Sequence, residues 1–364
     1  MALTAGESGT IYANPAPLLV SRQAAFPGLV ALPGGDILAM FSIGQAFDAA
    51  DMRAHVCRSR DGGRSWSEPV RMHAAERAES ESFKPVLLPD GRLLATGYVF
   101  ERPDDLTPIA DPVTQELLPM RNRAAISHDG GHTWSEPHAF SVDGAALELS
   151  GPAIALDDGT LLAAGAPFHL RPEGQEGWLI ESRDGGTSWS RRSVFFAGGH
   201  VAPWECRLCR MGDGRIAVQV WAYDLAAQAN LDVQLCLSDD DGHSFAPPLA
   251  TGIRAQASNL MSLTHDRLLA IHAHREAPAG LVLREMRAGA GADAVEVLSE
   301  LALFGGADRA AHSGGGIVGQ FASLRFGQPG LLRLSPREAL ACCWMVEDGQ
   351  HVIKSWPIGL PEPG

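Results

Sequence analysis

The stretch "SRDGGRSW" at residues 59–66 decides the fold, because close copies of it return along the chain. The copies read "SHDGGHTW" at 127–134, "SRDGGTSW" at 182–189 and "SDDDGHSF" at 238–245. An Asp side chain accepts hydrogen bonds from nearby backbone N–H groups, and Gly supplies the positive φ of a tight turn. Each copy therefore predicts a hairpin turn, with its aromatic residue folded back beneath the turn against its own sheet. The residues concerned are Asp61, Asp129, Asp184 and Asp241, with Trp66, Trp134, Trp189 and Phe245.

The spacing of these turns indicates a repeat architecture. They begin 55–68 residues apart, a period typical of propellers and other arrays. A second series of segments, each with two short apolar runs around a turn, lies out of phase with them at 26–41, 83–98, 150–165, 205–220, 258–273 and 320–335. One inner hairpin and two outer strands per repeat predict a six-bladed β-propeller, which leaves few exposed sheet edges. The N-terminal "GTIYANP" and the C-terminal "HVIKSWPIG" are expected to share the last blade and close the ring.

The repeated motif Ser-x-Asp-x-Gly-x-Ser/Thr-Trp resembles the Asp-box, or BNR repeat, of the sialidase superfamily. The resemblance covers nearly the whole chain and implies an all-β fold, a sialidase-like six-bladed β-propeller with four-stranded antiparallel blades. We therefore expect one propeller domain over residues 1–364. The longest expected loop, at 101–123, lies between the inner hairpin and the Asp-box of the second blade, where it can overhang a pocket.

The composition of the chain argues against some classes of binding partner. The formal net charge is −14 without a basic cluster, which argues against nucleic acid and against an anionic membrane. Apolar runs of transmembrane length and an N-terminal signal pattern are both missing from the sequence, so we expect a cytoplasmic protein. The six cysteines lie mostly in apolar, strand-like runs and are expected to be buried free thiols. We expect no cofactor and no bound metal, and the sequence leaves the oligomeric state open.

The resemblance also implies a set of site residues at the mouth of the central channel. Sialidases hold the substrate carboxylate with three arginines and use a Tyr–Glu nucleophile pair and an Asp acid/base. Glu205 in "WECRLCRMGDG" matches the Glu, and the loop after the first hairpin offers Asp48 and Asp51. Arg275, in "IHAHRE", lies near the position that the resemblance gives to the third arginine. The departures from the pattern are Ala25 and Trp221 in place of the other two arginines, and Phe321 in place of the Tyr.

These departures argue against the standard sialidase mechanism for this chain. An arginine clamp binds a carboxylate through paired hydrogen bonds, so losing two of its three members should abolish tight sialic acid binding. A Phe side chain cannot act as a nucleophile.

The polar residues that remain still predict a carbohydrate site. We assign acid/base roles to Glu205, Asp48 and Asp51, because paired carboxylates cleave glycosides. The residues expected to bind and orient the sugar are Lys84, Trp204, Arg275, His274, Phe321 and Arg123. Structural roles stay open beside these: Glu205 can pair with Arg207, and Lys84 with Glu81. His272 and His274 form an H-x-H pair, which can bind zinc or supply a base.

Three functional hypotheses follow. The first is a carbohydrate-active enzyme, a glycoside hydrolase or lyase that acts on a small polar or acidic oligosaccharide. The second is a non-catalytic propeller that binds a sugar or a protein, and the third is a true exo-sialidase. The first two both predict an aromatic-lined pocket. Only the enzyme needs two titratable groups that converge at the pocket floor.

Overall fold

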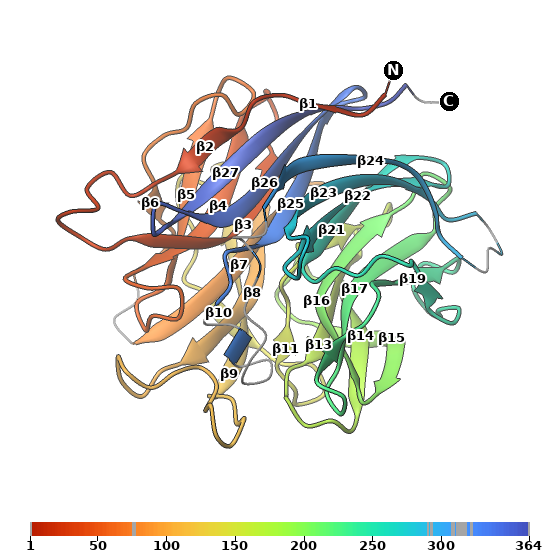
Figure 1. Ribbon diagram of the computed structural model, residues 1–364, viewed down its shortest axis with the longest axis horizontal. Coiled ribbons are helices and arrows are strands. Elements are labelled where there is room, and N and C mark those ends of the chain that lie inside the picture. The colour runs from red at the N-terminus through yellow and green to blue at the C-terminus, as the bar shows by residue number, and fades with distance from the viewer. Residues whose placement is uncertain are drawn as a thin grey trace.

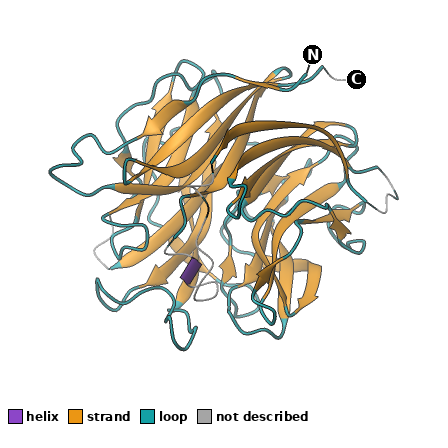
Figure 2. Ribbon diagram, in the orientation of Figure 1, coloured by secondary structure: helices purple, strands orange, loops and turns teal. Residues whose placement is uncertain are grey.

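The structure is a computed structural model that describes residues 2–74, 78–289, 291, 294–306, 310, 319–320 and 323–362. In this part of the chain the strands form six antiparallel sheets, which are arranged as the blades of a propeller (Figure 1). Loops and turns join the strands at both ends of the blades (Figure 2). The predicted six-bladed propeller with four-stranded antiparallel blades is confirmed. Within the described residues, no helix has the length and apolar character needed to cross a membrane.

The first three blades follow one another along the chain, and each runs outward from its innermost strand. Blade 1 contains β3 (Gln23–Ala31), β4 (Ile37–Gly44), β5 (Arg53–Ser59) and β6 (Val70–Arg71). Blade 2 contains β7 (Glu79–Leu87), β8 (Leu93–Glu101), β9 (Met120–Ser127) and β10 (His138–Phe140). Blade 3 contains β13 (Leu161–Pro167), β14 (Gln175–Ser182) and β15 (Ser190–Gly199). Two short strands, β11 (Leu147–Glu148) and β12 (Ile154–Ala155), precede β13 in the chain and both pair with it.

The last three blades complete the ring. Blade 4 contains β16 (Val201–Arg210), β17 (Ile216–Asp224), β19 (Gln234–Ser238) and β20 (Leu249–Ala250), with β18 (Ala229–Asn230) paired to β17. Blade 5 contains β21 (Ser258–Thr264), β22 (Arg267–His274), β23 (Gly280–Arg287) and β24 (Glu296–Gly305). Blade 6 contains β25 (Phe326–Ser335), β26 (Glu338–Glu347) and β27 (Gln350–Gly359), with β1 (Thr4–Ala5) and β2 (Gly9–Tyr12) on its outer edge.

The two ends of the chain close the ring, as the sequence predicted. Both N-terminal strands pair antiparallel with β27, so that Thr4 lies opposite Gly359 and Gly9 opposite Ser355. Figure 1 shows the two termini side by side at the top of the view. The first and last segments of the sequence therefore share blade 6.

The predicted sixth hairpin at 320–335 is wrong. β25 runs through most of this segment as one strand, and its hairpin partner is β26. The Gln328-Pro329-Gly330 sequence suggests a turn, but its pairing register shifts there, so it forms a β-bulge. Pro lacks the N–H that a regular ladder needs, which is why the strand bulges at this point.

The apolar core lies between the blades. In the described part of the chain, six apolar clusters each join the facing sides of two successive blades. Between blades 1 and 2, for example, Leu38 and Met40 of β4 pack with Phe83 and Leu93 of the next blade. Apolar contact of this kind is the main favourable term in folding, so the boundaries hold the ring together.

Each Asp-box is a turn held by its own Ser and Asp side chains. In the first box the N–H and Oγ–H of Ser65 donate to Asp61 at 2.9 and 2.6 Å, and the N–H of Gly63 donates to Ser59 Oγ at 2.8 Å. The same hydrogen bonds return in the second and third boxes. In the first box, Ser65 above all holds the pKa of Asp61 down at about 2.

The fourth box uses a different Asp from the one the sequence suggested. Asp240 accepts the N–H and Oγ–H of Ser244 at 2.9 and 2.6 Å. Asp241 has a φ of 56° and stands where the first box has Gly62. The sequence assignment chose Asp241 because it directly precedes a Gly, but the Ser–Asp spacing of the motif selects Asp240.

The aromatic residue of each box packs against the preceding blade as well as beneath its own turn. The Trp66 Nε1–H donates to the carbonyl of Gly63 at 3.2 Å, as expected for a side chain folded under the turn. The ring of Trp66, however, joins the cluster between blades 6 and 1, and Trp134 joins the cluster between blades 1 and 2. The prediction of burial against the box's own sheet is therefore corrected: the box fastens its blade to the one before it.

We expect Gly131→Ala to lower the free energy of unfolding by about 2–4 kcal/mol, because strain and overpacking add at this site. Gly131 has a φ of +88°, and a Cβ there would lie 2.3 Å from Leu38 Cδ1 of blade 1. The matched control is Gly130→Ala, which has a φ of +69° and no atom nearer than 4.0 Å to the added Cβ. Urea unfolding measures both. Equal losses in the two variants would show that the box does not press closely on the preceding blade.

Candidate functional site

A cavity of about 770 Å³ lies at the end of the propeller where the innermost strands begin. Buried polar residues form its floor: Glu148, Glu205, Arg275 and Gln328, with the partly buried Tyr98 beside them. Aromatic residues form much of its sides: Phe26, Phe47, Phe100, Phe168, Trp204, Trp221, Trp344 and His351. A concave, mostly apolar site with a few convergent polar groups is the usual form of a small-molecule site.

Bulges in three innermost strands direct side chains into this cavity. Phe26 in β3, Glu205 in β16 and Gln328 in β25 have φ values of 62°, 47° and 40°. The strand pairing shifts register at each of them. A left-handed backbone at a non-glycine residue costs on the order of 1 kcal/mol, and such strain clusters at functional sites. Bulges also re-aim side chains, and here residues from blades 1, 4 and 6 meet at one cavity.

Two buried carboxyl groups are neighbours on the floor. Glu148 ends β11 and is 4% exposed, and its Oε2 accepts the backbone N–H of Glu205 at 2.8 Å. Burial raises the pKa of Glu148 to about 7, and the charge of Glu205 acts in the same direction. Ser150 and Arg207 oppose this rise. A carboxyl group that keeps its proton near neutral pH is able to act as an acid.

Two guanidinium groups flank Glu205. Arg207 Nη2 lies 3.7 Å from Glu205 Oε2, and Arg275 Nη2 lies 3.7 Å from Oε1. These contacts place one cation beside each carboxyl oxygen of Glu205. Among the described residues, Glu205 Oε2, Arg207 Nη2 and Arg275 Nη1 are buried without a hydrogen-bond partner. Buried polar atoms of this kind call for a ligand or ordered water.

The phenol of Tyr98 lines the same cavity as Glu148 and Glu205. Burial raises the pKa of Tyr98 well above its ordinary value, and the charges of Glu148 and Glu205 add to the rise. The side chain therefore stays neutral at pH 7 and can donate a hydrogen bond. Tyr98 lies in β8 of blade 2, whereas the sialidase resemblance placed a Tyr in the last blade, at Phe321. Phe321 lies outside the described residues.

Four of the predicted site residues line the cavity: Glu205, Asp48, Trp204 and Arg275. Trp204 stacks on Tyr223, with ring centroids 4.9 Å apart, and presents an aromatic surface beside Glu205. Arg275 follows β22, and its Nε–H donates to the Phe326 carbonyl at 3.1 Å. Trp221, which occupies the expected position of an arginine, lies with its ring 5.4 Å from the Arg275 guanidinium carbon.

Asp48 is held by other protein groups. Its Oδ1 accepts a hydrogen bond from Arg102 at 2.9 Å, and its Oδ2 accepts the N–H of Ile109 at 3.3 Å. Asp48 thereby ties the loop after β4 to the segment between β8 and β9. Residues of that segment line the cavity, so the loop predicted to overhang a pocket does so. They are Pro108, Ile109, Ala110, Pro112 and Leu117.

Three other predicted residues do not line the cavity, because each side chain is engaged elsewhere. Asp51 accepts the Gln45 N–H at 2.9 Å. Arg123 forms a two-point ion pair with Glu79 at 2.8 and 2.6 Å. His274 accepts a hydrogen bond from Arg284 at 3.0 Å. Arg123 lies in β9 and His274 ends β22, while Asp51 lies in the loop before β5, and the sequence pattern gave no means of telling these positions from cavity positions.

Lys84 lies beneath the floor and is 2% exposed. Its Nζ donates to the Phe26 carbonyl at 2.7 Å and to Gln328 Oε1 at 3.2 Å. Burial lowers the pKa of Lys84 to about 7, with Arg207 adding to the effect and Glu205 opposing it. Lys84 was predicted to bind substrate. Its contacts instead connect the bulges of β3 and β25, which gives it a supporting role in the shape of the floor.

The H-x-H pair and the cysteines form no metal centre in the described residues. No group of three or more His, Cys, Asp or Glu there is arranged to hold an ion. His272 is fully buried in blade 5, and neither of its ring nitrogens has a hydrogen-bond partner within the described ranges. All six cysteines are buried and free, as the sequence predicted.

Sequence reasoning missed Glu148 and Tyr98. Glu148 is the lone charged residue in "ALELSGP", directly before the third inner hairpin, and an isolated carboxyl in an apolar run is a signal of a buried functional group. Tyr98 closes the second inner hairpin, at the same end of its blade as Glu205. Both signals depend on knowing which end of each hairpin faces the channel.

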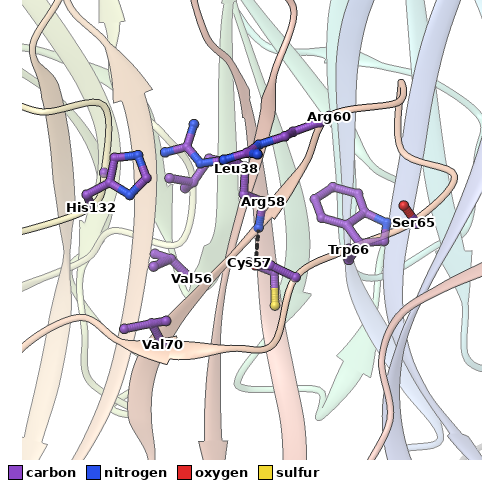
Figure 3. A pocket seen from close by; sticks show the side chains of 11 residues that line it. Leu38, Val56, Cys57, Arg58, Arg60, Ser65, Trp66, Val70 and His132 are labelled. Atoms are coloured by element: carbon purple, nitrogen blue, oxygen red, sulfur yellow. Dashed lines mark hydrogen bonds between the residues drawn. The ribbon is translucent and has the colours of Figure 1, made fainter.

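A second hollow, of about 520 Å³, lies near the other end of β5, between the first two Asp-boxes (Figure 3). Arg58, Trp66, Val70 and His132 are among the residues around it. Arg58 donates to Asp36 at 3.2 Å and also to the Gly130 carbonyl of the second box. No carboxyl group is among the described residues that line this hollow, whereas Glu148 and Glu205 line the channel cavity.

Fold and cavity together define the class: a sialidase-like six-bladed β-propeller, a fold shared with sialidase glycosidases. The chain matches no protein-family model and no curated protein. Its structure is similar to a Dyadobacter fermentans protein of unknown function, with a TM-score of 0.78 and 18% identity over 99% of each chain. It is also similar to the NanB sialidase from Streptococcus pneumoniae, with a TM-score of 0.65 and 10% identity over 93% of this chain and 68% of that one.

A third similar structure is the intramolecular trans-sialidase from Ruminococcus gnavus. Its TM-score is 0.64 at 13% identity, over 93% of this chain and 95% of that one. At identities this low, the likeness establishes the fold and leaves the activity to be argued from the cavity.

Proposed function

We propose that the chain is a glycoside hydrolase that uses Glu148 and Glu205 as an acid/base pair. The observation that carries the proposal is the hydrogen bond from the backbone N–H of Glu205 to the Glu148 carboxyl group, which places two buried Glu residues side by side at the floor of an aromatic-lined cavity. Their environments differ in the way that acid/base pairs require. Burial keeps the proton on Glu148, while Arg207 and Arg275 place one cation beside each carboxyl oxygen of Glu205.

The chemistry follows from these two states. Glu148 donates its proton to the glycosidic oxygen, and the leaving group departs with the electron pair of the broken bond. Glu205 accepts a proton from the water that attacks the anomeric carbon. The neutral phenol of Tyr98 donates a hydrogen bond to a sugar oxygen beside the pair. The next cycle begins once the proton on Glu205 passes to solvent and Glu148 is protonated again.

The sugar is a polar or acidic small carbohydrate. Arg207 Nη2 and Glu205 Oε2 form an ion pair at 3.7 Å, but neither atom makes a hydrogen bond within the described residues, and the same holds for Arg275 Nη1. A ligand that carries both hydroxyl groups and an acceptor such as a carboxylate would satisfy these atoms. Trp204 supplies an aromatic face for the sugar ring.

The test is a panel of glycosides that includes sialosides and uronides, incubated with the full-length protein. We expect turnover of a non-sialoside by the wild type and by Asp51→Asn, whose carboxylate lies outside the cavity lining. The double variant Glu148→Gln/Glu205→Gln is the negative control and should show no turnover. If the folded wild type turned over none of the glycosides, that result would contradict the proposal and favour a non-catalytic sugar-binding propeller.

Turnover that survives in the double variant would also contradict the assignment, because it would place the chemistry on other residues. Turnover of a sialoside alone would show instead that the missing arginines and the displaced Tyr do not prevent sialidase activity.

A further inference from the structure

The side of the cavity formed by blades 1 and 6 carries an aromatic wall, which we define as Phe26, Phe47, Trp344 and His351. The Phe47 ring is central: its centroid lies 5.3 Å from Phe26, 4.9 Å from Trp344 and 5.4 Å from His351. Phe47 and His351 are stacked, with 23° between their planes. Phe47 belongs to the loop after β4, whereas Trp344 and His351 lie in β26 and β27. Segments far apart in the chain therefore build one surface.

His351 contributes to the wall as an uncharged ring. Its Nδ1 lies 3.0 Å from Gln23 Oε1, and its backbone N–H donates to the same oxygen at 2.7 Å, which fixes the orientation of the side chain. Burial lowers the pKa of His351 to about 4, and the charge of Arg325 acts in the same direction. At neutral pH the ring is therefore available for stacking without a charge.

An apolar cover lines the same cavity as the wall. The segment between β8 and β9 folds back on itself through a bridge between Ala110 and Leu117, and Asp48 and Arg102 hold it against the loop that carries Phe47. The cavity-lining residues of this cover are Pro108, Ile109, Ala110, Pro112 and Leu117. Leu324 and Val346 also line the cavity, and they pack in the same apolar cluster as Phe26, Phe47 and Trp344 of the wall. Arg325 is the cation on this side, and it is exposed at the rim.

The cavity therefore has a polar part and a mainly apolar part. Buried hydrogen-bonding groups gather at the floor, around Glu148 and Glu205, while the space between the wall and the cover is lined mainly by rings and aliphatic carbons. The Asp48 carboxylate also lies there, and it already accepts hydrogen bonds from Arg102 and from the Ile109 N–H. A second sugar ring in that space would find few hydrogen-bonding partners beyond the Asp48 carboxylate and Arg325 at the rim, which is unfavourable for its hydroxyl groups. A planar apolar group would instead stack on Phe47 and lose nothing.

We propose that the space between the aromatic wall and its cover binds the aglycone of the substrate, and that this aglycone is aromatic. The inference rests on the proposed glycosidase function and names its substrate class: an aryl glycoside, with its sugar on the polar floor and its aryl group on Phe47. Phe47 is then a specificity-determining residue.

The test measures binding of the aglycone alone, so that it does not depend on the sugar or on turnover. The probe is 4-methylumbelliferone, titrated into the full-length protein, with quenching of tryptophan fluorescence as the readout because Trp344 lies in the wall. We expect saturable binding by the wild type and a loss of affinity of roughly tenfold in Phe47→Leu, which keeps an apolar side chain but removes the ring. Phe245→Leu, in the fourth Asp-box, is the matched control and should bind as the wild type does.

Two results would overturn the inference: no saturable binding by the folded wild type, or equal affinity of wild type and Phe47→Leu. The outcome is separable from that of the proposed function. Probe binding that depends on Phe47, without turnover of any glycoside, would retain the aryl subsite and reject the hydrolase. Turnover of a glycoside by a protein that does not bind the probe would retain the hydrolase and reject the aryl subsite.

Discussion

Glu148→Gln is expected to lower kcat/KM by about 10³-fold and, at the same time, to make the protein more stable above pH 7. The loss of activity follows because the amide of Gln is too weak an acid to transfer a proton to the leaving group, and general acid catalysis contributes about 10²–10⁴-fold. The gain in stability follows because the wild type must bury an ionised carboxyl group at high pH, whereas a neutral amide of the same shape carries no such charge.

The direction of the pH effect is set by the raised pKa. The native carboxyl of Glu148 keeps its proton up to about pH 7, whereas an ordinary Glu loses its proton near 4.5. Between these values the native state binds more protons than the unfolded state, so the free energy of unfolding falls as pH rises. A shift of this size corresponds to about 3 kcal/mol lost between pH 4.5 and pH 7, and the loss persists above pH 7.

The measurements are kcat/KM against pH and urea unfolding at about pH 5 and pH 8. The wild-type kcat/KM should fall as pH rises through about 7, because the acid form of Glu148 is lost. The stability difference between Glu148→Gln and the wild type should shift in favour of the variant at the higher pH. A variant that keeps its activity, or a stability difference that does not change with pH, would contradict the assignment of Glu148.

Arg275→Met is expected to destabilise the protein by about 3–5 kcal/mol, because it leaves Glu205 with one fewer cation in a buried site. Arg275 is 4% exposed, lies 3.7 Å from Glu205 Oε1 and packs over Trp221. Met retains much of the apolar stem and so isolates the effect of the charge.

A double-mutant cycle with Glu205→Gln tests this explanation. Once Glu205 is neutral, the loss of the Arg275 charge should cost less, so the double variant is expected to be more stable than the sum of the single effects predicts. Urea unfolding of the four proteins gives the coupling. Additive losses would show that Arg275 stabilises the fold through packing alone and does not support the charge of Glu205.

The architecture was predictable because its signals are local and repeated. The Ser-Asp-Gly turns at 59–66, 127–134 and 182–189 each contain the side chains that hold the turn, so the sequence alone identifies them. Five of the six inner hairpins were found for the same reason. The sixth was misplaced because Gln328-Pro329-Gly330 has the composition of a turn but forms a bulge within β25.

The site was less predictable because its residues meet only through the closure of the ring. Glu205 was found through its motif, and Trp204 through its place beside Glu205. Glu148 comes from a different blade, and its contact with the Glu205 N–H depends on the bulge at Glu205, which has no marker in the sequence. The sequence predicted that Lys84 binds the sugar and that Asp48 acts as an acid or base, but their contacts show that they support the shape of the cavity.

The protonation of Glu148 is the central claim, and carboxyl ¹³C NMR of glutamate-labelled protein measures it most directly. Spectra of the wild type and Glu148→Gln would be compared from about pH 4 to pH 9. We predict one carboxyl resonance that titrates near pH 7 in the wild type and is missing from the variant. If every wild-type glutamate resonance has finished titrating by about pH 5.5, Glu148 is ionised at neutral pH and the acid/base pair proposed for this cavity does not exist.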